Sequence, residues 1–379
     1  MEKVVKFKSA LGSIKKETKK DYVVDNQIKG RSFSSNHAKL LKHMDRLIEL
    51  QEGKRPRPVM FHMSPCNPCN LTCSFCCFAN RAMKEMLTVE QMKSAIDQFW
   101  DLGVRGMEFT GGGEPTLHPK LDEVIEYAYN KGFKMGICTN GSKLRKIKNW
   151  HMMSWVRLGM YSFDEKKPYE YHLDVFDGLD DIEITAAYVW DGATDTSTNP
   201  NITGEWLDDH AKKLATNEYK EENFMKMLKW VEDHKIPCRI AFNAIKDTKI
   251  VQQDIETIKG LIARHEAEHG KLEYAFLSDF NFKGERRNNH CYMHGVKPCV
   301  FTDGNVYVCP SAELAPENLY QVNDDFKLCD IEGITEFYNS QVGGPDNFRR
   351  HHDCSFCKYA YQNELIDDIL MPTKHNEFA

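Results

Sequence analysis

The sequence predicts an α/β fold built around a parallel β-sheet. Two observations support this class. Strand-like apolar runs alternate with helix-like segments from residue 59 to residue 265. Turn-forming residues such as Gly, Asn and Ser close several of the strand-like runs. Alternation of this kind implies parallel strands that are joined by right-handed crossover connections.

Six segments in this region are predicted to be strands and four to be helices. The strands cover residues 59–63, 106–110, 134–139, 156–162, 182–189 and 238–245. The helices cover residues 88–102, 120–129, 221–233 and 249–265. In the first helix Val89, Met92, Ile96 and Phe99 recur on one face, and Thr88 is a favourable N-cap. A short strand at 272–277 is expected to lead into the C-terminal part.

Residues 1–54 are predicted to form an N-terminal arm and a capping helix. Residues 1–34 are Lys-rich and weakly periodic, which is typical of a solvated surface arm. Residues 36–50 predict an amphipathic helix that covers the sheet. Its expected apolar stripe comprises Leu40, Leu41, Met44, Leu47 and Ile48.

The composition indicates the class of protein and its compartment. A formal charge of −6 and a pI near 6.2 give no strong signal for nucleic-acid binding. No apolar run approaches the length of a membrane-spanning helix, and the N-terminus lacks the apolar core of a signal peptide. We therefore expect a cytoplasmic protein without a membrane partner. In that compartment the 13 cysteines favour metal or redox chemistry over disulfides.

Five of these cysteines lie within residues 66–77. Cys69, Cys73 and Cys76 have the spacing C-x3-C-x2-C, and three thiolates on one loop can hold three corners of a 4Fe-4S cube. The fourth iron is then open to a substrate or cofactor. The flanking Cys66 and Cys77 are expected to pack within the loop. The alternative is a zinc knuckle that adds Cys66 to the three, although its spacing is cramped for a tetrahedral site.

A second motif, Thr110-Gly-Gly-Gly-Glu-Pro115, follows the second predicted strand. The aromatic residue between the second and third spaced cysteines is Phe75. On these residues the sequence resembles the radical S-adenosylmethionine (SAM) superfamily. The resemblance implies a partial (β/α)6 TIM-like barrel over residues 55–283. In such barrels the reactive groups lie at the carboxyl ends of the strands, where both motifs fall.

The resemblance also implies a cofactor set and a reaction. Cys69, Cys73 and Cys76 would hold the SAM-binding 4Fe-4S cluster, and SAM would chelate its open iron. One electron would then cleave SAM reductively to a 5′-deoxyadenosyl radical, which abstracts a hydrogen atom from the substrate. A flavodoxin or ferredoxin is the implied electron donor. The other cofactor-binding residues that the resemblance implies are Phe75, Gly112, Gly113, Glu114, Asn140 and Ser162.

These residues have separate expected roles. Gly112 and Gly113 let the backbone approach SAM, and Glu114 or nearby carbonyls pair with its ammonium group. Phe75 lies near the adenine, and Asn140 and Ser162 face the ribose or carboxylate. The family's glycine-rich motif has no match in the fifth strand. No catalytic acid or base stands out, and the weak candidates are Tyr161, Asp279 and Asp303.

Residues 284–365 hold a second group of cysteines and, at 302–309, a hairpin-like segment that contains an Asp-Gly turn. Their order resembles the auxiliary-cluster domain called twitch, the short form of SPASM. The resemblance implies a small α+β domain that binds one auxiliary 4Fe-4S cluster, because full SPASM needs further cysteines. The implied ligands are Cys291, Cys309, Cys354 and Cys357.

Other cysteines of this part remain open. Cys299 is expected in the core, and Cys329 is either a packing residue or a spare ligand. A zinc ribbon is the alternative for the whole part. Residues 366–379 are expected to be a frayed tail.

The substrate is the least determined feature. We expect a small molecule or nucleotide, with the auxiliary cluster assisting oxidation or substrate binding. The alternatives are a peptide, as in maturases of ribosomal peptides, or a base in nucleic acid. A non-enzymatic alternative is a zinc-binding interaction module, which needs neither the glycine turn nor the alternation of strands and helices. The long polar segment 190–220 is either a lid at the barrel mouth or a surface insertion.

Overall fold

The fold was established from a computed structural model. It describes residues 37–73, 75–76, 78, 82–165, 167–192, 217–243, 248–277, 290–309, 326–340 and 359–370. The predictions for residues 1–34, for Cys77 and Asp279, and for most of segment 190–220 lie outside the described residues. So do those for Cys354 and Cys357.

Ten strands of the described residues form one sheet. They are β1 (Met60–Met63), β2 (Gly106–Phe109), β3 (Lys134–Thr139), β4 (Trp155–Gly159), β5 (Glu183–Trp190), β6 (Cys238–Phe242), β7 (Ala275–Leu277), β8 (Cys299–Val300), β9 (Asn305–Tyr307) and β10 (Lys327–Asp330). Their order is β10-β9-β8-β1-β2-β3-β4-β5-β6-β7. Strands β1 to β7 pair in parallel, as does β8 with β1, whereas β9 is antiparallel to both of its neighbours.

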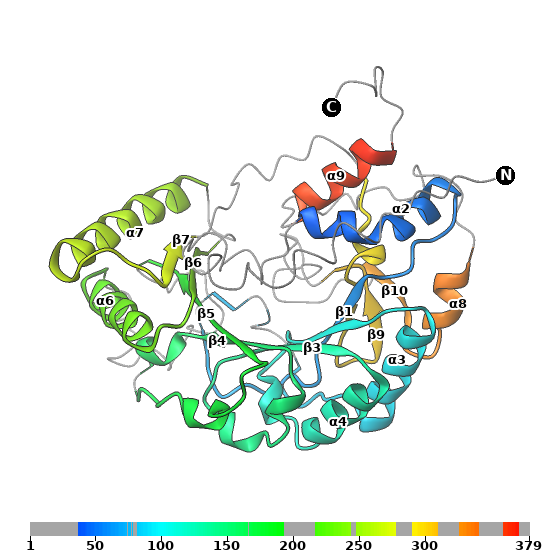
Figure 1. Ribbon diagram of the computed structural model, residues 1–379, viewed down its shortest axis with the longest axis horizontal. Helices are drawn as coiled ribbons and strands as arrows, with labels where there is room; N and C mark the ends of the chain where they lie inside the picture. The colour runs from blue at the N-terminus through cyan, green and yellow to red at the C-terminus, as the bar shows by residue number, and fades with distance from the viewer. Residues whose placement is uncertain are drawn as a thin grey trace, which may run out of the picture.

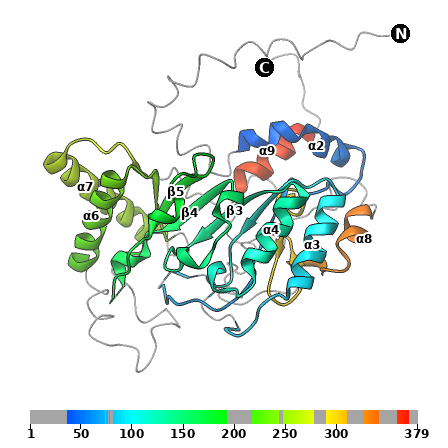
Figure 2. The same cartoon turned by 60° about the horizontal axis from the view of Figure 1, so that its bottom comes forward.

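The sheet curves without closing, because β7 and β10 are its two described edges. Helices α3 (Val89–Asp101), α4 (Leu121–Lys131), α6 (Asn217–His234) and α7 (Thr248–His269) lie on the outer side of the arc (Figure 1). Turning the molecule shows α3 and α4 packed side by side against the strands (Figure 2). The predicted α/β class and the partial barrel are confirmed.

Side-chain alternation explains why the strands adopt this arrangement. Phe61 and Met63 of β1 are fully buried against the helices, and the Phe61 ring stacks on Phe99 of α3 with centroids 4.2 Å apart. The intervening His62 therefore faces the barrel interior. The predicted start of α3 is also correct: the Thr88 side chain accepts a hydrogen bond from the Gln91 amide at 3.1 Å and completes a capping box.

Three strands are shorter than predicted. β4 ends at Gly159 rather than at 162, and β6 ends at Phe242. β7 takes up only the last three residues of the range 272–277. After β4 the chain turns into the 3-10 helix η5 (Tyr161–Asp164), because the Tyr171 hydroxyl donates to the Gly159 carbonyl at 2.7 Å. The Tyr171 hydroxyl, and not a backbone amide of a neighbouring strand, is the partner of the Gly159 carbonyl.

The predicted stripe of the N-terminal helix is correct at Leu40 and Leu47 and wrong at Leu41, Met44 and Ile48. The segment begins as the 3-10 helix η1 (His37–His43) and continues as α2 (Met44–Gln51). A 3-10 helix has three residues per turn, so the phase of the buried face shifts. The buried residues are Leu40, Leu47 and Leu50, whereas Leu41, Met44 and Ile48 are 41–51% exposed.

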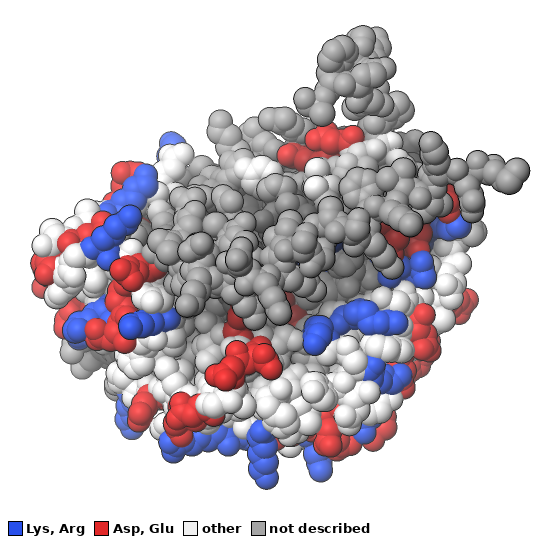
Figure 3. All heavy atoms as spheres, viewed as in Figure 1, with Lys and Arg blue, Asp and Glu red and all other residues white. Residues whose placement is uncertain are grey.

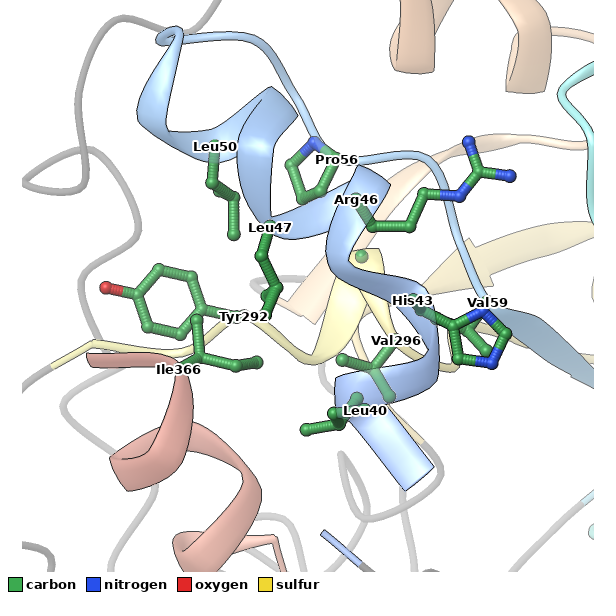
Figure 4. A pocket seen from close by; sticks show the side chains of 11 residues that line it. Leu40, His43, Arg46, Leu47, Leu50, Pro56, Val59, Tyr292, Val296 and Ile366 are labelled. Carbon is green, nitrogen blue, oxygen red and sulfur yellow. The ribbon is translucent and has the colours of Figure 1, made fainter. Parts of the chain in front are cut away.

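The buried face of α2 packs on the C-terminal part of the chain. Leu47 and Leu50 meet Tyr292 and Ile366 across a small apolar pocket (Figure 4). Ile366 belongs to α9 (Ala360–Leu370), which lies beside α2 in both cartoon views (Figures 1 and 2). The N-terminal helix therefore ties the two ends of the described chain together.

The C-terminal strands extend the barrel sheet. β8 pairs directly with β1, and the predicted hairpin forms between β8 and β9 with Gly304 at φ +78° in its turn. Val300, Val306 and Ile334 lie in the same hydrophobic core as the barrel. The predicted boundary near residue 284 thus separates two parts that share one sheet and one core.

Candidate active site

The cysteine loop follows β1 at the carboxyl edge of the sheet. Within it the Cys76 amide donates to the Cys73 carbonyl at 3.1 Å. Burial raises the pKa of the Cys73 thiol, and the neighbouring Cys76 and Cys69 raise it further. The three predicted ligands therefore lie within electrostatic reach of one another.

The donor set of this loop fits a three-thiol cluster. Among the described residues, no three Cys, His, Asp or Glu side chains surround a single point as the ligands of one metal ion would. The ligands of a four-iron cube bind different irons, so they need not converge in that way. Cys66 is buried, its thiol donates to the Glu114 carbonyl at 3.2 Å, and burial raises its pKa to about 12. The Cys66 thiol already has the Glu114 carbonyl as its partner, which favours the three-thiol cluster over the zinc knuckle.

The glycine turn docks directly on the cysteine loop. The Gly113 amide donates to the Cys66 carbonyl at 2.8 Å, and the Glu114 amide donates to the Pro68 carbonyl at 2.9 Å. A Cβ atom on Gly113 would lie 2.0 Å from the Pro68 carbonyl oxygen. Gly112 has φ +55°, which a side chain would strain. These glycines are therefore required for the two loops to touch.

The Glu114 carboxylate joins the glycine turn to the end of β3. One oxygen accepts hydrogen bonds from the Thr116 amide at 3.0 Å and from the Thr116 and Thr139 hydroxyls at 2.6 Å. The other accepts from the Asn140 amide at 2.7 Å. The side chain is buried, and this burial raises its pKa. The observed role of Glu114 is to join the glycine turn to β3. Its contact with the SAM ammonium group stays a prediction.

Asn140 lies against the cysteine loop. Its side-chain amide donates to the Asn70 side chain at 3.0 Å and approaches the Cys69 sulfur at 4.0 Å. Its carbonyl accepts from the Tyr169 hydroxyl at 2.7 Å. The structure therefore brings Asn140, Glu114 and Cys69 together. A contact between Asn140 and SAM stays a prediction.

Two tyrosines of the site were missed by sequence analysis. Tyr169 bonds Asn140, and its own amide donates to the Ser162 hydroxyl at 2.7 Å. Tyr171 donates to Gly159 and accepts from the Ser162 amide at 3.2 Å. The alternating Tyr-x-Tyr pair shortly after a strand was the available signal. Ser162 is buried in this network, and its predicted role toward SAM stays a prediction.

Phe75, His118 and Asp303 occupy distinct places. The ring centroids of Phe75 and Tyr161 lie 5.0 Å apart, so the aromatic residue of the cysteine motif packs on the segment that follows β4. His118 bonds the Leu87 carbonyl at 3.0 Å, which is a structural contact. Asp303 caps the hairpin turn through the Asn305 amide at 3.0 Å. Asp303 thus serves the turn between β8 and β9.

The described cysteines of the C-terminal part are found in three environments. Cys291 and Cys309 share a small apolar cluster with Tyr359. Cys299 is buried in β8, as expected of a core residue, and the half-buried Cys329 packs from β10 against the main core. The first two predicted auxiliary ligands are therefore neighbours.

On the face of Figure 3, Lys and Arg are interspersed with Asp and Glu over the described residues. None of the described helices combines the length and the apolar character needed to cross a bilayer.

Comparison with known proteins finds similarities over part of the chain. Residues 63–184 match the Radical SAM superfamily, and this stretch contains every residue predicted for the first cluster and for SAM. The chain is 40% identical over 80 residues to an S-adenosylmethionine-dependent nucleotide dehydratase from Selenomonas ruminantium, which covers 21% of this chain and 29% of that protein.

Two further similarities extend the comparison. The chain is 33% identical over 92 residues to the antilisterial bacteriocin subtilosin biosynthesis protein AlbA of Bacillus subtilis (strain 168), which covers 24% of this chain and 20% of AlbA. Streptococcus suis SuiB bound to S-adenosylmethionine aligns with a TM-score of 0.49 and 14% identity, over 86% of this chain and 84% of SuiB. The match spans less than a third of the length of either curated relative.

Proposed function

We propose that this chain is an enzyme of the radical SAM superfamily in which Cys69, Cys73 and Cys76 bind a 4Fe-4S cluster that acts together with SAM. The bound pair supplies a carbon-centred radical that abstracts a hydrogen atom from the substrate. One observation carries the proposal. The three cysteines lie together on a loop that is docked on the glycine turn, within the stretch that matches the family.

The surrounding residues hold this loop in place. The Glu114 carboxylate fixes the glycine turn against β3, and Asn140 bridges from β3 to the loop. Tyr169 in turn fixes the Asn140 carbonyl. The Phe75 and Tyr161 rings pack together, and Tyr161 lies within electrostatic reach of the Cys73 thiol. These contacts would hold the cluster and SAM in a fixed position relative to the substrate, and acid or base side chains alone cannot supply the radical chemistry of that pair.

A small molecule or nucleotide is the proposed substrate class. The similarity to a nucleotide dehydratase supports it. A peptide substrate is the second candidate, which the similarity to a bacteriocin biosynthesis protein favours.

We further propose an auxiliary 4Fe-4S cluster on Cys291, Cys309, Cys354 and Cys357, and a flavodoxin or ferredoxin as electron donor. The proximity of Cys291 and Cys309 supports the auxiliary site.

Iron content after anaerobic purification tests the cluster assignment. Two four-iron clusters predict about eight irons in the wild type and about four in the triple variant Cys69→Ala/Cys73→Ala/Cys76→Ala. Cys66→Ala is the matched control and should keep about eight, because its thiol already bonds Glu114. Four irons in the wild type and none in the triple variant would remove the auxiliary cluster. A wild type without iron would overturn the proposed function.

SAM cleavage tests the reaction. With a chemical reductant, the wild type should form 5′-deoxyadenosine from SAM, and the triple variant should form none. A ribonucleotide that increases this rate would support the first substrate class. A rate that responds only to peptides would replace it with the second.

A further inference from the structure

The C-terminal helix α9 buries polar side chains where an ordinary amphipathic helix buries apolar ones. Its buried residues are Gln362, Asn363, Ile366 and Asp367, of which only Ile366 is apolar. Buried polar groups destabilise a fold unless specific partners satisfy them. The contacts of Asn363 and Asp367 therefore indicate what α9 is placed to hold.

Asn363 is fully buried and uses both ends of its side-chain amide. Its oxygen accepts a hydrogen bond from the Tyr292 backbone amide at 2.7 Å, and its nitrogen donates to the Tyr359 carbonyl at 3.0 Å. The Tyr292 amide is part of the peptide bond that joins Cys291 to Tyr292. One buried side chain thus fixes the backbone next to Cys291 against the start of α9.

Asp367 holds the same segment from one helical turn further along α9. Its carboxylate accepts a hydrogen bond from the Tyr292 hydroxyl and lies 3.0 Å from Nδ1 of His290. Asp367 is 6% exposed and Tyr292 is 1% exposed. The Tyr292 ring also lies beside Ile366 in the small apolar pocket (Figure 4). The residues on both sides of Cys291 are therefore bound to one buried carboxylate.

This segment carries one of the predicted auxiliary ligands. Cys291 belongs to one apolar cluster with Met293, Cys309 and Tyr359. Tyr359 directly precedes α9, and Cys357 lies two positions before Tyr359 in the sequence. Contacts outside the ligand set orient the ligands of a metal centre. Helix α9 therefore joins the segment of one predicted ligand to the part of the chain that supplies another.

We propose that Asn363 and Asp367 are positioning residues for the auxiliary cluster. They fix the backbone on both sides of Cys291, so that its side chain stays near Cys309. This assignment rests on the auxiliary cluster of the proposed function. It adds that the auxiliary cluster depends on α9, whereas the first cluster depends on the glycine turn and β3.

Iron content of the anaerobically purified full chain tests the assignment. Asn363→Leu keeps the size of the side chain and removes both hydrogen bonds, so iron should fall from about eight toward about four per chain. The irons that remain should belong to the first cluster, so adding Cys69→Ala/Cys73→Ala/Cys76→Ala should leave about none. Asn363→Asp keeps an oxygen that can accept from the Tyr292 amide and should retain about eight irons.

Asp367→Asn and Asp368→Asn form a matched pair. They remove the same charge from neighbouring positions of α9, but Asp367 is buried and Asp368 is exposed. The electron paramagnetic resonance signal of the reduced auxiliary cluster is read in the triple cysteine variant, which lacks the first cluster. Asp367→Asn should change this signal and lower its intensity, because hydrogen bonds to a carboxylate are stronger than those to a neutral amide. Asp368→Asn should leave the signal unchanged.

The outcomes are distinguishable. The assignment is overturned if Asn363→Leu and Asp367→Asn both keep the iron and the signal of their parents. It is also overturned if Asn363→Leu by itself loses both clusters, because α9 would then support the whole fold. If Asn363→Leu does not fold, Asp367→Asn, which preserves the shape of the side chain, decides. A wild type with about four irons, all lost in the triple cysteine variant, would remove the auxiliary cluster itself. Failure of the proposed function is thus recognised in the wild type, before any change to α9.

Discussion

At the scale of single residues, the glycine turn acts on the cysteine loop itself. The resemblance implied that its glycines let the backbone approach SAM. The structure shows a second demand, because the space beside Gly113 is filled by the backbone of Asn67 and Pro68. Removing that fit would separate the turn, and the Glu114 carboxylate with it, from the three thiols.

We predict that Gly113→Ala lowers the iron content of the first cluster. The new Cβ would lie 2.0 Å from the Pro68 carbonyl, so the turn and the loop must move apart. Iron should fall from about eight toward about four per chain. Gly260→Ala is the control: nothing lies within 4 Å, and the residue is in α7. It should keep its iron and stabilise the protein by roughly 0.5–1 kcal/mol. Full iron in Gly113→Ala would refute the argument.

At the scale of elements, the start of α3 borders the site. Thr88 and Gln91 cap the helix reciprocally. The preceding Leu87 donates its amide to the Pro65 carbonyl at 3.0 Å and accepts from His118. The cap thus fixes the segment on which the base of the cysteine loop rests.

Thr88→Ala is predicted to loosen this junction. Loss of an N-cap costs about 1 kcal/mol, so amides in the first turn of α3 should exchange with solvent roughly fivefold faster. Hydrogen exchange read by mass spectrometry measures this. Thr257→Ala is the control, since that hydroxyl only bonds the Gln253 carbonyl within α7. Exchange in α3 should not change in the control, and equal exchange in both variants would show that the cap is dispensable.

At the scale of the whole molecule, the barrel and the C-terminal part form one sheet. β1 pairs with β2 on one side and with β8 on the other. The Gln98 side chain of α3 donates to the Ile331 carbonyl at 2.7 Å and accepts from the Thr335 amide at 3.0 Å. The first element of the barrel is therefore an interior strand of a larger sheet.

We predict that residues 1–289 alone do not form a stable monomer. Removal of the residues after 289 would turn β1 into an exposed edge strand. It would also remove Val300, Val306 and Ile334 from the core of the barrel. Soluble expression and size-exclusion chromatography measure the outcome. A chain ending at residue 370 is the control, because it keeps α9 and should stay monomeric if the full chain is. A folded, monomeric 1–289 fragment would show that the barrel is independent.

The sequence predicted the local elements well, for a physical reason. Strand and helix periodicities depend on neighbours two to four residues apart, so six barrel strands were recognised within a few residues of their bounds. The cysteine spacing and the glycine turn are equally local. Part of the stripe of α2 was missed because a 3-10 turn precedes it, and the end of β4 was missed because Tyr171, from beyond the strand, terminates it.

By itself, the sequence determined the α/β class, the three-cysteine loop and the glycine turn, and it carried the resemblance to the family. Only the tertiary structure decided that Gly113 is packed by the cysteine loop and that Tyr169 supports Asn140. It alone brought His62 and Arg157 close to Glu108. These neighbours come from different strands, and the curvature of the sheet, which no local pattern encodes, brings them together.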